Sequence, residues 1–317
     1  MPSRQKNDEV YRLRSFAKIN LGLEILGKRR DGFHELKTIF QTIRLHDTLT
    51  LTPTAGRRLH IEGNDPSVDW QGDNTIRLAF DTFGAAFNLR PGFHIRVEKK
   101  IPPGSGLGGG SSNAAVILMF LSRYYRRELS LNRLIRLGET IGADVPFFFI
   151  GGTALGRGKG EKLFEIRDLG ERTIGLYIPD IRVSTEKIFS RFSLTSDRFP
   201  SKIDSFLKNK KLAVLENHLE SVTFNLFPEL RMIKEKIEMN FNCPVWMSGS
   251  GSALYTIAPR KDLSRLQTVF PGLLVTRLLN RKNYHRKWIG VSPSGKASVF
   301  GADIRGFKSS HPSFFKD

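Results

Sequence analysis

A glycine-rich loop, residues 102–112, has the residue types needed to hold phosphate groups. Five glycines occupy the seven positions 104–110, so few side chains keep the backbone away from a bulky anion. The next residues, 111–125, are predicted to form an apolar helix, whose unpaired N–H groups and positive dipole end favour an anion at the same place. The predicted phosphate-binding residues are Pro102, Gly104, Ser105, Gly106, Leu107, Gly108, Gly109, Gly110, Ser111 and Ser112.

Two common phosphate-binding patterns do not match the glycine-rich loop. No Lys follows its last glycine, as the nucleoside-triphosphate pattern G-x-x-x-x-G-K-[ST] requires. The dinucleotide pattern also fits poorly, since no clear βαβ unit carries an acidic residue about 20 positions further on. A flexible Gly/Ser linker is the simplest alternative, but such linkers rarely lie between a strand and a strongly apolar helix.

Lys18 and Asp144 are the candidates for moving a phosphoryl group onto a hydroxyl. Lys18 lies in an apolar predicted strand, and a buried ammonium usually requires an acidic partner. Asp144 could accept the hydroxyl proton while Lys18 stabilises the transferring phosphoryl oxygens. Taken alone, Asp144 before Val145 and Pro146 could equally cap a helix or turn. The sequence leaves both roles of Asp144 open, base or positioning group.

The elements that must position these residues interleave strands and helices without a regular βαβ repeat, which favours an α+β fold. A strand is expected over residues 11–26, with Lys18 and Asn20 as polar insertions, and Asp144 directly precedes an apolar run. Glycine and charge content rise around residues 157–160. We expect helices at about residues 73–87, 111–125, 185–191, 214–219 and 228–241. The predicted units are an N-terminal domain over residues 1–157, a C-terminal domain over residues 158–289 and a basic tail over residues 290–317.

The formal net charge of +19 suits either a solvated basic surface or a site for a polyanion. No zinc-finger spacing, RNA-binding signature or heptad repeat is present, so a nucleic-acid partner is not expected. The longest apolar runs fall far short of the roughly 20 residues of a membrane span. The N-terminal residues lack the apolar centre of a secretory signal. We expect a cytoplasmic enzyme without a membrane partner, and no pattern indicates an oligomeric state.

The glycine-rich loop resembles the ATP-binding motif of the GHMP kinases, the family that includes galactokinase, homoserine kinase, mevalonate kinase and phosphomevalonate kinase. Residues 16–21 resemble that family's first motif. The second glycine turn, residues 247–252, resembles its third motif. The resemblance implies a two-domain fold with the active site in the cleft between the domains. It also implies ATP and Mg²⁺ as cofactors, and Lys18 and Asp144 as the catalytic pair.

The resemblance sharpens toward members of the family that act on a small-molecule substrate, a cytidine diphosphate conjugate, in isoprenoid precursor synthesis. It rests on residues 17–21, 30–36, 141–148 and 151–158, and extends over about residues 15–287.

A cytosine pocket follows from this narrower resemblance. It implies that one of Phe33 and His34 stacks on the base while the other hydrogen-bonds its edge, and that Phe189 covers the opposite face. Related kinases usually carry Tyr where this chain has Phe33, so a hydroxyl is missing there. Asn20 is a candidate substrate contact. Asn74 resembles a residue lining the adenine pocket, although a plain helix cap explains it nearly as well.

Two alternative functions explain the sequence less well than a kinase for a cytidine diphosphate conjugate does. Another kinase of the family, acting on mevalonate or homoserine, gives no reason for the Asp31-Gly32-Phe33-His34 segment. A basic nucleic-acid-binding protein leaves Lys18, Asp144 and the glycine-rich loop unexplained. The protein ligands of Mg²⁺ are not identified by any motif. Both Ser112 and an ion held only by water and phosphate fit the sequence.

Overall fold

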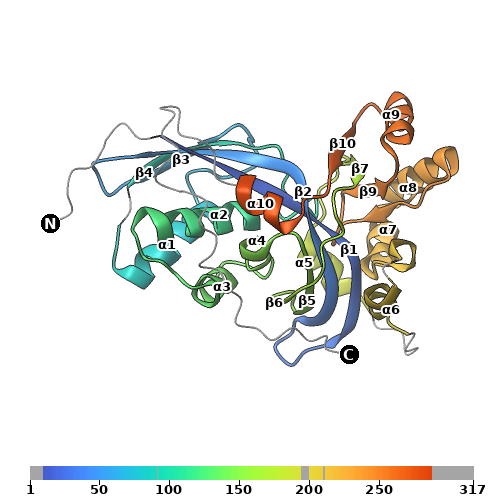
Figure 1. Cartoon of the computed structure of the whole chain (residues 1–317), viewed down its shortest axis with the longest axis horizontal. Coiled ribbons are helices and arrows are strands. Elements are labelled where there is room, and N and C mark those ends of the chain that lie inside the picture. The colour runs from blue at the N-terminus through green and yellow to red at the C-terminus, as the bar shows by residue number, and fades with distance from the viewer. Residues whose placement is uncertain (1–9, 91, 194–199, 210, 288–317) are drawn as a thin grey trace.

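The computed structural model describes residues 10–287, except for residues 91, 194–199 and 210. Two β-sheets, each with helices packed on it, lie side by side along the long axis of the molecule (Figure 1). This mixture of sheets and helices confirms the predicted α+β class. The predicted basic tail, residues 290–317, lies outside the described residues.

The first sheet is built on a long antiparallel hairpin. Its two strands pair from Tyr11 opposite Leu51 to Lys28 opposite His34, and register shifts interrupt the pairing on both sides of Lys18. The second strand of the hairpin also pairs with two shorter strands, one along each half of its length. The strands of this sheet are β1 (Tyr11–Lys28), β2 (His34–Pro53), β3 (Leu59–Gly63), β4 (Phe93–Glu98), β5 (Thr153–Gly158) and β6 (Lys162–Glu165).

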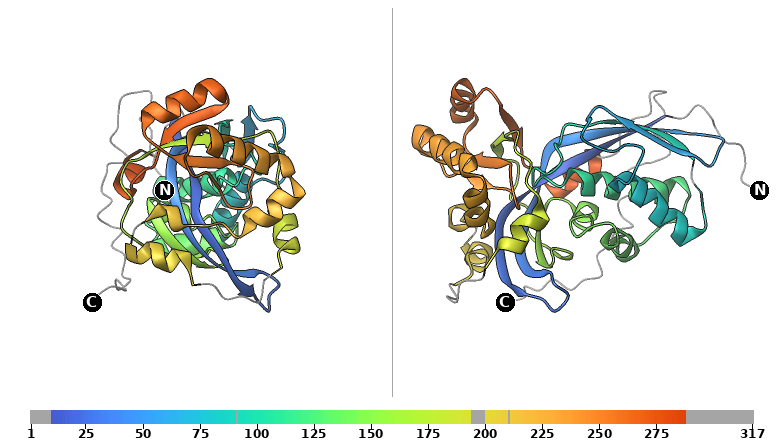
Figure 2. Two further views of the ribbon diagram at one scale, coloured as in Figure 1. Left: turned by 90° about the vertical axis from the view of Figure 1, so that its right-hand side faces the viewer. Right: turned by 180° about the vertical axis from the view of Figure 1, so that it is seen from behind.

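Helices cover one face of the first sheet, as the view from behind also shows (Figure 2). The helix that follows the glycine-rich loop packs directly on β1, because its residues from Ala114 to Leu121 are apolar and buried. The neighbouring helices complete a core of aliphatic and aromatic side chains. The helices of this layer are α1 (Thr75–Phe87), α2 (Gly109–Tyr124), α3 (Leu131–Glu139) and α4 (Phe147–Ile150).

The second sheet has four strands in the order β10-β7-β9-β8, and α7, α8 and α9 lie on its side away from the first sheet (Figure 1). A central core of Ile19, Ile43, Leu176 and other buried side chains joins the hairpin to this sheet. The strands are β7 (Thr173–Tyr177), β8 (Trp246–Met247), β9 (Leu254–Ile257) and β10 (Leu273–Arg277). The helices of this half are α5 (Thr185–Arg191), α6 (Lys202–Asn209), η1 (Leu212–Val214), α7 (Leu219–Leu226), α8 (Pro228–Phe241), α9 (Arg260–Val269) and α10 (Arg281–Lys287).

The prediction of a helix at residues 214–219 is wrong. This segment instead lies beside β1, where the Leu23 N–H donates to the Glu216 carbonyl and the His218 N–H donates to the Leu23 carbonyl, both at 2.9 Å. These hydrogen bonds to a distant strand replace the ones a helix would supply, and α7 begins only at Leu219.

The first sheet continues past the predicted domain boundary, because β6 pairs with β5. The boundary after residue 157 stays a prediction. None of the helices in the described part of the chain is long and apolar enough to cross a bilayer.

Candidate active site

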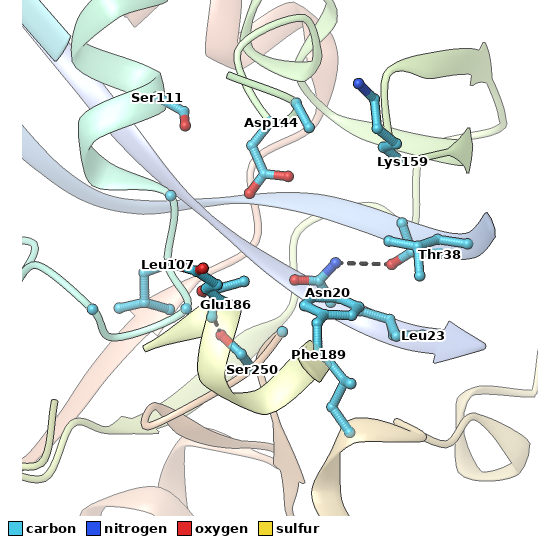
Figure 3. A pocket seen from close by; sticks show the side chains of 18 of the residues that line it. Asn20, Leu23, Thr38, Leu107, Ser111, Asp144, Lys159, Glu186, Phe189 and Ser250 are labelled. Atoms are coloured by element: carbon cyan, nitrogen blue, oxygen red, sulfur yellow. Dashed lines mark hydrogen bonds between the residues drawn. The ribbon is translucent and has the colours of Figure 1, made fainter. Parts of the chain in front are cut away.

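A cavity of about 860 Å³ is lined by residues from both halves of the molecule. The first half contributes β1, β2, the glycine-rich loop and the turn that carries Asp144, while the second half contributes α5 and the second glycine turn. Asp144 and Ser111 lie on one side of this cavity, and Glu186, Phe189 and Ser250 lie on the opposite side (Figure 3).

The backbone of the glycine-rich loop requires glycine at three alternate positions. Gly104, Gly106 and Gly108 have φ angles of 70°, 75° and 70°, a left-handed region that costs other residues about 1–2 kcal/mol. Gly108 is also the N-cap of α2 and offers no side chain to the first turn of the helix. The N–H groups of that turn therefore stay available to an anion in the cavity.

Surrounding segments hold the carbonyl groups of the loop. The carbonyl of Ser105 accepts from the Ala253 N–H at 3.0 Å, and that of Leu107 accepts from the Lys18 N–H at 2.9 Å. Gly106 presents its carbonyl to the hydroxyl of Ser248 at 2.9 Å. Because these oxygens are engaged by the protein, the loop can offer its donors rather than its acceptors to a phosphate.

A fully buried carboxylate anchors the start of the loop. Asp47 lies 2.6 Å from the Lys99 ammonium and accepts from the N–H groups of Lys100 and Ile101 at 2.7 and 2.8 Å. With its amide nitrogen turned toward them, Asn113 of α2 donates to Asp47 and to the Ser15 hydroxyl. Charge-assisted bonds of this kind fix both ends of the loop to the hairpin.

The second glycine turn is held by a buried side chain that the sequence did not indicate. The amide of Asn217 donates to the carbonyls of Met247 and Gly249 at 2.9 and 2.7 Å. The Thr223 hydroxyl donates to the Ser250 carbonyl at 3.1 Å. These hydrogen bonds fix the second glycine turn, which itself contacts the glycine-rich loop through the Ser248 hydroxyl.

Lys18 and Asp144 meet in the cavity. The Lys18 ammonium lies 3.3 Å from the Asp144 carboxylate and donates to the Asn20 side-chain oxygen at 2.6 Å. Asn20 in turn donates to the Thr38 hydroxyl at 2.8 Å (Figure 3). Lys18 is buried, whereas one third of the Asp144 side chain is exposed. Asp144 can therefore reach a hydroxyl that enters the cavity while Lys18 stays fixed.

Aromatic side chains lie at another part of the cavity wall. The rings of His34 and Phe189 contact each other at 5.4 Å between centroids, and the Phe33 ring is 56% exposed. The ammonium of Lys159 lies 4.4 Å from the centre of the Phe33 ring. Burial, with the nearby charge of Lys28, lowers the pKa of His34, which favours a neutral imidazole.

The cavity brings together most of the residues singled out in the sequence: Lys18, Asn20, Phe33, His34, Pro102, Gly104, Ser105, Gly106, Leu107, Gly108, Gly109, Gly110, Ser111, Asp144 and Phe189. Asn74 and Ser112 are not among its lining residues. Asn74 caps α1 by accepting from the Arg77 N–H at 3.0 Å. Ser112 is fully buried and accepts a hydrogen bond from Ser15 at 2.7 Å.

Several lining residues were not found from the sequence, among them Thr38, Lys159 and Glu186. Lys159 had a signal, because it is a lysine between two glycines in a charged turn. Thr38 and Glu186 had none, since a polar residue in a strand or in the first turn of a helix is ordinary.

Comparison with known proteins agrees with this geometry. The sequence matches the GHMP kinases N terminal domain over residues 74–152 and the GHMP kinases C terminal domain over residues 204–271. The chain belongs to the GHMP kinase family, and the predicted class of phosphotransferase and its two-domain kinase fold are confirmed.

Within that family the chain groups with the 4-diphosphocytidyl-2-C-methyl-D-erythritol kinases, as the sequence predicted. It is 39% identical to the kinase of that name from Solibacter usitatus, over 87% of this chain and 91% of the relative. Identity to the Thermotoga maritima kinase is 37%, over 77% and 91% of the two chains.

Solved structures give the same grouping. A crystal structure of 4-(cytidine 5'-diphospho)-2C-methyl-D-erythritol kinase superposes with a TM-score of 0.72 at 32% identity, over 84% of this chain and 98% of that one. A homoserine kinase from Cytophaga hutchinsonii has a TM-score of 0.66 at 15% identity, over 90% and 98%, which reflects the shared fold alone.

Proposed function

We propose that this chain transfers the γ-phosphoryl group of ATP to the 2-hydroxyl of 4-diphosphocytidyl-2-C-methyl-D-erythritol, a step of isoprenoid precursor synthesis. The observation that carries the proposal is the 3.3 Å pair of Lys18 and Asp144, in a cavity also lined by the glycine-rich loop and by Phe33, His34 and Phe189. The names of the close relatives support the choice of acceptor. A cytoplasmic location remains a prediction.

The glycine-rich loop and the N-terminus of α2 would hold the phosphates of ATP. Free N–H groups and the positive end of the helix dipole suit a triphosphate, and the engaged loop carbonyls would not repel it. Mg²⁺ prefers oxygen ligands, and Ser111 and Glu186, on opposite sides of the cavity, each offer one, so the residues present fit an ion held by one of these side chains together with phosphate and water. When bound, Mg²⁺ would neutralise the charge of the triphosphate.

Asp144 would accept the proton of the attacking hydroxyl. Its partly exposed carboxylate is the acceptor, and the buried ammonium of Lys18 would stabilise the oxygen that loses the proton and the transferring phosphoryl oxygens. The side-chain oxygen of Asn20 accepts a hydrogen bond from the Lys18 ammonium and holds it in place. Asn20 would therefore position Lys18 in addition to contacting the substrate.

The cytidine end of the substrate would lie against the aromatic side chains. Phe33 and Phe189 both line the cavity, so a flat base could stack on one of these rings or between them. A neutral His34 imidazole can hydrogen-bond the cytosine edge in either direction. Lys28 and Lys159 would supply positive charge for the diphosphate.

The decisive experiment measures ADP formation with ATP, Mg²⁺ and one acceptor at a time. Turnover with the cytidine conjugate, but with neither mevalonate nor homoserine, is the expected result. Turnover with one of the other alcohols would keep the kinase chemistry and overturn the cytidine pocket. Folded protein that binds ATP and phosphorylates none of the three would overturn the proposed acceptor.

A further inference from the structure

Two histidines and a glutamate come together at the edge of the first sheet, outside the cavity of the active site. His60 and Glu62 lie on β3, and the side chains of residues two apart in a strand point to the same face. His94 lies on β4 directly opposite His60 in the parallel register. One potential ligand atom from each of the three side chains lies within 4.8 Å of the other two.

The polar atoms of this cluster are not fully satisfied by the protein. The Nε2 atom of His94 is buried and makes no hydrogen bond to any described residue. It lies 3.5 Å from Oε1 of Glu62, which is within reach of a shared ion. The rings of His60 and His94 lie 5.0 Å apart between centroids. Although the Glu62 carboxylate faces it, this ring nitrogen makes no hydrogen bond within the described part of the chain, which leaves it available to a ligand that the protein itself does not supply.

We propose that His60, Glu62 and His94 form a binding site for a divalent transition-metal ion of the zinc class. Two imidazoles and one carboxylate are a ligand set for Zn²⁺, with a fourth position left for water. Ligand atoms on a tetrahedral Zn²⁺ lie about 3.3 Å apart, so small side-chain rotations would complete the site. Imidazole nitrogens disfavour Mg²⁺ and Ca²⁺, which distinguishes this site from the magnesium of a kinase reaction.

Arg96 would compete with the metal ion for the Glu62 carboxylate. Its guanidinium lies 2.8 Å from Oε1 of Glu62, the same oxygen that faces His94. A bound cation would have to share this carboxylate or displace the arginine, whose side chain is 74% exposed and can move into solvent. The affinity of the site is therefore set by Arg96 as well as by the three ligands.

A metal ion bound by these three residues would link the edge strand β3 to β4. β3 ends at Gly63, and the next residue, Asn64, exchanges hydrogen bonds with the backbone of Lys99 at 2.7 and 3.3 Å. A metal that binds only the folded chain adds stability through mass action. The expected consequence is a higher melting temperature in the presence of Zn²⁺, without any requirement for the metal in phosphoryl transfer.

The test is titration of the full chain with Zn²⁺, free of nucleotide, by calorimetry and by thermal melting. His60→Gln and His94→Gln should each weaken Zn²⁺ binding by at least about tenfold and abolish the rise in melting temperature. Arg96→Ala should tighten binding, because it frees the carboxylate of Glu62. His46→Gln is the matched control: this histidine lies on β2 of the same sheet, outside the cluster, and its loss should change neither readout.

His60 is exposed, so its replacement leaves the fold intact and gives an unambiguous result. Absence of Zn²⁺ binding by the parent chain would overturn the proposal. Equal Zn²⁺ affinity in the parent and in both histidine variants would overturn it as well, since the ion would then be bound elsewhere.

Discussion

The ammonium of Lys18 lies 3.3 Å from the carboxylate of Asp144, although one comes from the first strand and the other from the turn before α4. The backbone N–H of the same lysine donates to the Leu107 carbonyl of the glycine-rich loop at 2.9 Å. A single residue of β1 thus fixes both the loop and the charged pair. Register shifts in the hairpin on either side of Lys18 allow this strand to direct both groups.

Replacing Asp144 by Asn should lower kcat by about 10²–10⁴-fold, because the amide can no longer accept the hydroxyl proton. ATP binding should persist, since the glycine-rich loop is untouched. Steady-state kinetics with a separate measurement of ATP affinity provide the readout. Asp81→Asn, an exposed carboxylate on α1, is the control and should retain the parent kcat. A near-parent kcat in Asp144→Asn would remove this residue from the chemistry.

Gly106→Ala should damage the active site far more than Gly170→Ala. Both glycines have a φ of +75°, so both substitutions carry the same backbone strain. At Gly106 an added Cβ would lie 2.1 Å from the Ser248 carbonyl oxygen, whereas at Gly170 nothing lies within 4 Å. We expect Gly106→Ala to separate the glycine-rich loop from the second glycine turn, with loss of ATP affinity. Equal ATP affinity in the two variants would show that this close approach is unimportant.

The sequence was sufficient for features whose cause is local. The glycine-rich loop could be predicted because its backbone conformation and helix N-terminus depend on its own residues, and Lys18 was noticeable as a charge in an apolar strand. Asn217 could not be predicted, because its role depends on hydrogen bonds to the carbonyls of Met247 and Gly249, which lie thirty positions or more away in the sequence. The same dependence on a distant strand explains why the predicted helix over residues 214–219 failed. Tertiary hydrogen bonds outweighed local helix propensity there.

Phe33→Ala should raise KM for the cytidine conjugate by between about fivefold and a hundredfold, the loss expected from removing one stacking ring. KM for ATP should change little. Phe164→Ala is a close control, because that ring is 42% exposed and also lies beneath a cation, Arg157 at 5.7 Å, but outside the cavity. If both variants showed the same small change in KM, Phe33 would not be part of the cytosine site.

His285 should make the protein less stable in acid. Burial lowers the pKa of this imidazole from its ordinary 6.5 to about 4, and Nε2 lies 2.9 Å from the Ile150 carbonyl. Between these two pH values the unfolded chain binds a proton that the folded chain does not, so acid favours unfolding. The free energy of unfolding should fall with decreasing pH over this window, by at most about 1.4 kcal/mol per pH unit from this group. His285→Gln keeps a donor for the carbonyl but does not titrate, so urea unfolding at a series of pH values should give it a flatter profile. Parallel profiles for the parent and the variant would assign the acid sensitivity to other groups.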